Sequence, residues 1–86
     1  MNSDVQCIVL ECGLVLISQI ESVVSELGEP DCKLINPYLV NLDGSISKWL
    51  DDITDNIEVV MISSDKILTL VDPKQELLNS YLEENK

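Results

Sequence analysis

The chain contains one short polar segment whose residue types could bind a ligand, Ser63-Ser64-Asp65-Lys66, between the apolar runs 57–62 and 67–71. Its two hydroxyl groups, carboxylate and ammonium group could form hydrogen bonds with a base or a phosphate, although serine supplies neither charge nor a stacking surface. The flanking runs are rich in Val, Ile and Leu, which predicts two short strands joined by this turn. The four turn residues are therefore candidate ligand contacts.

Other combinations of reactive residues give weaker signals. The absence of histidine excludes a Ser-His-Asp triad and a histidine-ligated metal site. Asp51, Asp52 and Asp55 could offer oxygens to a hard cation, but the alternating acids and central glycine of a calcium loop are absent. Glu11 and Glu21 form no recognisable catalytic pair. We therefore expect a protein that is not an enzyme and that uses no metal or other cofactor.

The cysteines and the hydropathy pattern bear on the cellular compartment. Cys7, Cys12 and Cys32 are an odd number without CxxC spacing, which is typical of buried free thiols in a reducing compartment. The first residues lack a basic region followed by a long apolar stretch, and no segment reaches the ~18 consecutive apolar residues of a membrane span. We expect a soluble, cytoplasmic protein.

The charge of the chain disfavours a polyanionic ligand. There are 16 acidic residues against 5 lysines, and the formal net charge is −11. Proteins that bind nucleic acid neutralise phosphates with Lys and Arg, and the lysines here are scattered along the sequence. We expect a solvated acidic surface, to which a basic protein is a better match than RNA.

We interpret residues 1–86 as one domain with a β-rich body at about 5–71. The segment 14–27 is ambiguous, because its apolar residues have helical spacing while its β-branched residues and missing N-cap favour a strand. Residues 32–40 read as a strand in which Pro37 must lie at a bulge or an edge. Residues 41–56 read as a long acidic loop anchored by Trp49 and Leu50.

The tail predicts a helix at about 73–84. Asp72 can cap it, Pro73 suits its first position, and Gln75 lies three residues after the cap. An apolar stripe made of Leu77, Leu78, Tyr81 and Leu82 needs a surface to cover.

Two motifs resemble those of the Sm-like family of small, strongly bent five-stranded barrels. In "VLECGLVLISQIESV" Leu10 precedes a two-residue gap and Gly13, and an apolar residue stands at Ile20. The resemblance implies a mainly β fold, a small strongly bent five-stranded barrel with an added C-terminal helix. It also implies that 14–27 is one long bent strand.

The second motif is "VMISSDKILTLV", in which Ile62 precedes the polar turn and Ile67 and Leu70 follow it. In the Sm-like family the fourth strand of one subunit pairs with the fifth strand of the next and closes a ring. The resemblance implies a cyclic homo-oligomer, from pentamer to heptamer, with the turn Ser63–Lys66 at the pore rim. The implied subunit interface consists of Ile57, Val59, Val60, Met61, Ile62, Ile67, Leu68 and Leu70.

The pattern departs from RNA-binding members of the family at the residues that read RNA. Their Arg-Gly pair is replaced by Ser63-Ser64, and the loop "SELGEPDCK" at 25–33 has no Asn, His or aromatic residue. The helix and the acidic Trp-containing loop are more similar to Sm-like proteins of tailed phages of marine bacteria, which would work in the host cytoplasm. We therefore expect a ring-forming binding or assembly module, with RNA binding at the pore rim as the alternative.

Overall fold

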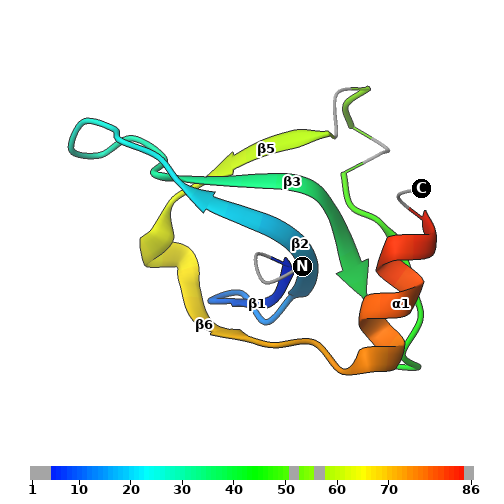
Figure 1. Cartoon of the computed structure of the whole chain (residues 1–86). Coiled ribbons are helices and arrows are strands. Elements are labelled where there is room, and N and C mark those ends of the chain that lie inside the picture. The colour runs from blue at the N-terminus through cyan, green and yellow to red at the C-terminus, as the bar shows by residue number, and fades with distance from the viewer. Residues whose placement is uncertain (1–4, 51–52, 56–57, 85–86) are drawn as a thin grey trace.

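The computed structural model describes residues 5–50, 53–55 and 58–84, and Figure 1 shows a strongly bent antiparallel sheet with the C-terminal helix beside it. The mainly β fold class with a C-terminal helix is confirmed. The elements are the strands β1 (Val5–Leu10), β2 (Val15–Ser22), β3 (Cys32–Val40), β4 (Ile46–Lys48), β5 (Val59–Ile62) and β6 (Ile67–Val71), the short 3-10 helix η1 (Ser64–Lys66) and the helix α1 (Gln75–Glu84).

In the residues that the structure describes the sheet is open and has six strands, one more than the strongly bent five-stranded barrel that the resemblance implies. Its order is β4-β3-β2-β1-β6, and β5 also pairs with β3. β5 and β6 follow each other along the chain, yet they are not paired with each other in the described part of the chain. The reason is η1, which carries the chain from the β3 edge across to the β1 edge instead of reversing it in a tight hairpin.

The additional strand, β4, lies in the segment 41–56, which we expected to be a loop. β4 forms a hairpin with β3 because the turn between them is closed locally. The Asn41 amide donates to the Ser45 carbonyl at 2.8 Å, the Asp43 carboxylate accepts from the Ser45 amide, and Gly44 has a φ of +90°. The role of Trp49 as an apolar anchor is confirmed, since it packs against the core cluster that contains Ile8.

The segment 14–27 contains a strand, but a shorter one than expected. β2 ends at Ser22, and 23–31 form a hairpin loop. Both β2 and β3 bend at a shift of pairing register beside Ser18 and Pro37, which confirms that Pro37 lies at a bulge. Residues 32–35 of β3, before the bend, pair with β5, and residues 38–40, after the bend, pair with β4. Both partners lie along the same edge of β3.

One carbonyl group at the bend receives two side-chain hydroxyls. The Ile35 oxygen lies 3.0 Å from the Ser18 hydroxyl and 3.0 Å from the Tyr81 hydroxyl. Ser18 and Tyr81 are almost completely buried, so water does not replace them. The bonds tie α1 and β2 to the turning point of β3.

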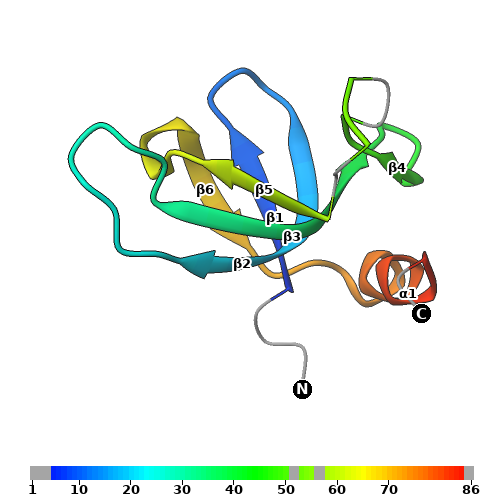
Figure 2. The same ribbon diagram turned by 90° about the horizontal axis from the view of Figure 1, so that it is seen from above.

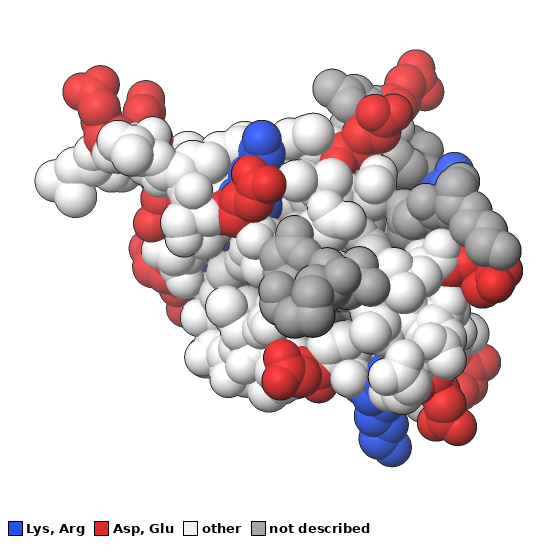
Figure 3. Space-filling model, in the orientation of Figure 1, with Lys and Arg blue, Asp and Glu red and all other residues white. Residues whose placement is uncertain are grey.

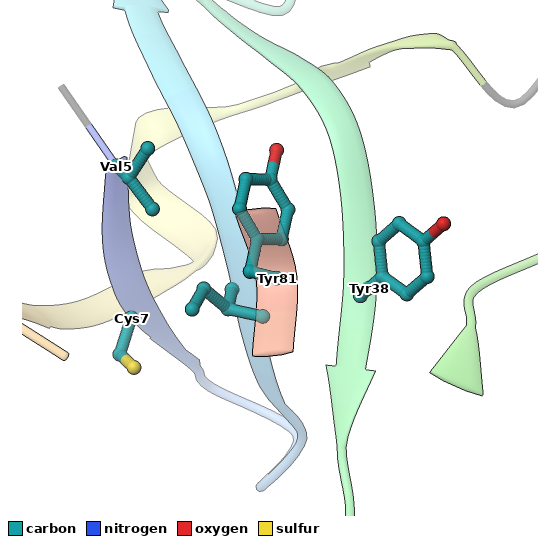
Figure 4. Close-up of a cluster of buried hydrophobic side chains, with 5 residues drawn as sticks. Val5, Cys7, Tyr38 and Tyr81 are labelled. Carbon is teal, nitrogen blue, oxygen red and sulfur yellow. The ribbon is translucent and has the colours of Figure 1, made fainter. Parts of the chain in front are cut away.

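The helix covers one face of the sheet. It begins at Gln75, two residues later than expected, where the Leu78 amide donates to the Lys74 carbonyl. Asp72 accepts a hydrogen bond from the Gln6 side chain. Figure 4 shows the cluster beneath the helix, in which the Tyr81 and Tyr38 rings meet edge to face at 5.8 Å. Its buried members are Val5, Cys7, Ile17, Tyr38 and Tyr81.

A second cluster packs on the other face of the sheet. Side chains of β1 alternate between the two clusters, as expected for a strand covered on both faces. The buried members of this second cluster are Ile8, Leu10, Leu16 and Leu34.

Replacing Tyr81 by Phe tests the role of the shared carbonyl. The ring and its packing remain, but the Ile35 carbonyl loses one of its two hydroxyl donors. We expect the free energy of unfolding, measured with urea at fixed protein concentration, to fall by about 1 kcal/mol. Ser80→Ala is the matched control, because Ser80 is exposed and its hydroxyl donates to the Glu76 carbonyl of its own helix. Equal stability of Tyr81→Phe and the unchanged protein would contradict the assigned role.

Candidate interaction site at the edge strands

The polar turn is built as a single turn of 3-10 helix. Ser63 is extended, with φ −80° and ψ 134°, and its carbonyl accepts from the Lys66 amide at 3.1 Å. Ser64, Asp65 and Lys66 are exposed, whereas Ser63 is half-buried. The turn joins β5 to β6, so its shape sets how these two strands lie relative to each other.

Asp31 holds the turn in place. Its Oδ1 accepts from the Ser64 amide and its Oδ2 from the Ser64 hydroxyl, both at 2.7 Å. We call this pair of bonds the Asp31–Ser64 clamp. The hydroxyl first, then the amide, hold the pKa of the Asp31 carboxyl below its ordinary value of 3.8, because both bonds favour the charged form. Sequence reasoning missed Asp31, because nothing near it indicates a partner 33 residues away.

The expected ligand contacts do not all face the same space. Ser63, Ser64 and Asp65 line a cavity of about 190 Å³ together with Gly28, Glu29 and Asp31. The three carboxylates among these residues make the cavity acidic, and two donors of Ser64 are already used by the clamp. A phosphate group would meet repulsion there rather than an anion site.

Lys66 lies on a different side of the turn. It lines a cavity of about 340 Å³ with Leu10, Glu11 and Cys12. The cause is a backbone bond of 2.8 Å from the Glu11 amide to the Lys66 carbonyl, which docks residue 66 onto the turn between β1 and β2. The cation and the two serines therefore do not converge on one ligand position.

Within the described residues β5 pairs with β3 alone, so its other edge is free, and that edge is apolar. The Asn36 amide donates to the Glu58 carbonyl at 2.7 Å, so residue 58 faces β3. Since backbone groups of successive strand residues face opposite edges, the Val60 amide also faces β3. The amides of Val59 and Met61 then face the unpaired edge, and their side chains are 44% and 45% exposed.

β6 presents the second free edge. It pairs with β1 on one side and with no other strand in the described residues. Leu68 and Leu70 are exposed, and an apolar groove of about 400 Å³ runs beside them. All expected interface residues except Ile57, which lies outside the described residues, belong to β5 or β6. The groove is lined by Ile20, Ser22, Cys32, Ser64, Ile67, Leu68, Thr69 and Leu70.

The cysteines are not all buried, which corrects one expectation. Cys7 and Cys32 are buried free thiols, and burial raises the pKa of each. Cys12 is an exposed thiol, because it lies in the turn that Gly13 closes with a φ of +98°. The neighbouring Gly13 indicates a turn and therefore an exposed position, whereas the number and spacing of the cysteines do not indicate exposure.

The structure does not bring the other sequence candidates together among the residues that it describes. Asp51 and Asp52 lie outside the described residues. Among the residues that the structure describes, no group of three or more Cys, Asp or Glu side chains could hold a metal ion. Glu21 lies 3.6 Å from the ammonium group of Lys33, and Glu11 lies beside Lys66 in the cavity of the β1–β2 turn. In the described part of the chain no helix has the length and apolarity needed to cross a membrane.

The Asp31–Ser64 clamp is testable by titration. Because the folded-state pKa is lowered, the clamp is intact above the ordinary aspartate value of 3.8 and is lost as pH falls through the folded-state value. We expect the Ser64 amide proton to shift in NMR spectra with a midpoint below 3.8. Asp31→Asn should abolish this shift, and Asp65→Asn should leave it. A Ser64 amide that titrates unchanged in Asp31→Asn would show that another carboxyl group is responsible.

The comparisons with known proteins identify the family. No curated protein matches the sequence. Residues 3–86 match the model described as "Family of unknown function (DUF6561)", which covers nearly the whole chain. The chain therefore belongs to the DUF6561 family.

Proposed function

We propose that the protein is a non-enzymatic binding and assembly module that forms an Sm-like ring in the cytoplasm, in the host cytoplasm if a phage encodes it. The observation that carries the proposal is the pair of free edges. β5 and β6 are apolar strands, and each has a strand neighbour on one side only in the described part of the chain. Such edges recruit another strand unless they are covered.

The order of the strands supports the Sm-like reading. Strands β1, β2 and β3 follow one another in space, β5 returns to the edge of β3, and β6 returns to the edge of β1. A 3-10 turn separates β5 from β6, at the position of the second motif of the resemblance. In this reading β4 is an addition within the connection between the third and fourth strands.

Pairing β5 of one copy with β6 of the next would cover both edges at once. The exposed side chains Val59 and Met61 would meet Leu68 and Leu70 of the neighbour, and the groove beside β6 would be filled. Burial of apolar area contributes roughly 25 cal/mol per Å², so four such side chains are a substantial driving force. The contact is head to tail, and repetition of it closes a ring if the rotation allows.

The charge of the module favours a basic protein as ligand. The cavity beside the turn is acidic, and the Asp31–Ser64 clamp occupies two of its donors. Figure 3 shows acidic side chains spread around the visible face with few lysines among them. RNA bound at the pore rim is the alternative, and its phosphates would face this acidic surface.

A proline at position 61 tests whether the ring can be broken while the subunit stays folded. The Met61 amide faces the free edge, so its loss removes a donor to a neighbour and none to β3. We expect Met61→Pro to give a folded monomer by native mass spectrometry and circular dichroism. Met61→Ala keeps the amide and serves as the control, and Val60→Pro should unfold the subunit. A monomeric unchanged protein at micromolar concentration would sink the ring proposal.

Binding to RNA distinguishes the two ligand classes. We expect oligo-U to bind with a Kd weaker than ~10⁻⁶ M at physiological salt, as non-specific contacts do. Ser63→Arg with Ser64→Gly should improve this only modestly, because the loop 25–33 offers no stacking group. Fluorescence anisotropy with oligo-U and a mixed-sequence RNA measures both. Nanomolar binding that prefers oligo-U would favour the RNA alternative over the basic protein.

A further inference from the structure

The loop between β2 and β3, residues 23–31, projects from the sheet and is called the arm. Figures 1 and 2 both show it at the end of the molecule opposite α1. Val24 and Leu27 are fully exposed on it, at 104% and 105% of their reference areas. Neither side chain contributes to the core, so packing within the subunit does not explain why aliphatic residues stand at these two positions.

The arm is held in one shape by its own backbone. At its base the Val23 amide donates to the Asp31 carbonyl at 2.9 Å, and at its tip the Glu29 amide donates to the Glu26 carbonyl at 3.0 Å. Gly28 makes the tip turn with a φ of +89°. The Asp31–Ser64 clamp fixes the base to η1. A partner that docks on the arm therefore orders little new backbone, which favours binding.

The charges around the two aliphatic side chains favour a positively charged partner. The segment 21–33 carries four carboxylates and one lysine, a formal sum of −3. The lysine, Lys33, lies 3.6 Å from Glu21, so it is matched within the segment. Acidic atoms are prominent on the projecting part of the molecule in Figure 3. RNA and anionic lipid would be repelled, whereas lysine or arginine side chains would be attracted.

Single exposed aliphatic residues are common on protein surfaces and do not indicate a binding site. Leu42, on the turn between β3 and β4, is one of these and is as exposed as Leu27. The arm differs because two aliphatic residues lie within four positions of each other, on a fixed loop with uncompensated acidic charge.

We propose that the arm docks a basic amphipathic segment of a partner protein. Val24 and Leu27 contact the apolar face of that segment, and Glu26 and Glu29 face its lysine or arginine side chains. This inference rests on the proposed preference for a basic protein, and it names the surface that makes the contact. It does not depend on the ring, because all these residues belong to one subunit.

The test uses the full chain and three short synthetic peptides of equal length. One is an amphipathic peptide of leucine and lysine, one replaces leucine by serine, and one replaces lysine by glutamate. We expect saturable binding of the first peptide by isothermal titration calorimetry. We expect Val24→Ser with Leu27→Ser to weaken that binding at least about tenfold, since two aliphatic contacts are lost.

Leu42→Ser is the matched control and should leave the affinity unchanged. The lysine–serine peptide should bind weakly, with no response to the arm substitutions. Absence of saturable binding, equal loss in Leu42→Ser, or equal binding of the glutamate peptide would overturn the proposal. Native mass spectrometry of the arm variant should give the mass of the unchanged protein, and a smaller assembly would instead assign the arm to contacts between copies. The ring proposal fails separately, through a monomeric mass of the unchanged protein.

Discussion

The bend of the sheet depends on one backbone group, the carbonyl of Ile35. This carbonyl lies beside the register shift between β2 and β3, and a buried carbonyl without a partner costs about 1–3 kcal/mol. The hydroxyls of Ser18 and Tyr81 satisfy it, one from the neighbouring strand and one from the helix. The bend in turn divides β3 between β5 and β4, so the position of the free edge of β5 follows from this interaction.

The two free edges are joined by a turn that is fastened from both sides. The Asp31–Ser64 clamp ties η1 to the arm, and the bond between Glu11 and Lys66 ties it to the turn between β1 and β2. These contacts hold the turn at both ends and thereby set the relative positions of β5 and β6. They also divide the candidate ligand contacts, since Lys66 is drawn toward one turn and Ser64 toward the other.

Sequence reasoning predicted the elements that carry local signals. The apolar runs on either side of residues 63–66 and the Asp72-Pro73 pair are such signals: β5 and β6 occupy the runs, and α1 begins two residues after Pro73. β4 was missed because the acidic composition of 41–56 outweighed the Asp43-Gly44 turn within it. Asp31 and the separate position of Lys66 could not be predicted, because each depends on a partner distant in sequence. The Sm-like resemblance suggested the bent strand, but local pattern alone left helix and strand open.

The pairing of β6 with β1 has a consequence for the order of folding. Even its nearest pair, Leu10 and Ile67, joins residues 57 positions apart (67 − 10), whereas β1 and β2 are joined by a short turn. Long loops cost more entropy to close, so distant pairings form late. The edge of β6 is therefore completed only after the hairpins of the subunit exist. A chain that has just been synthesised would lack this edge, so in the proposed ring each copy would have to fold before it could associate.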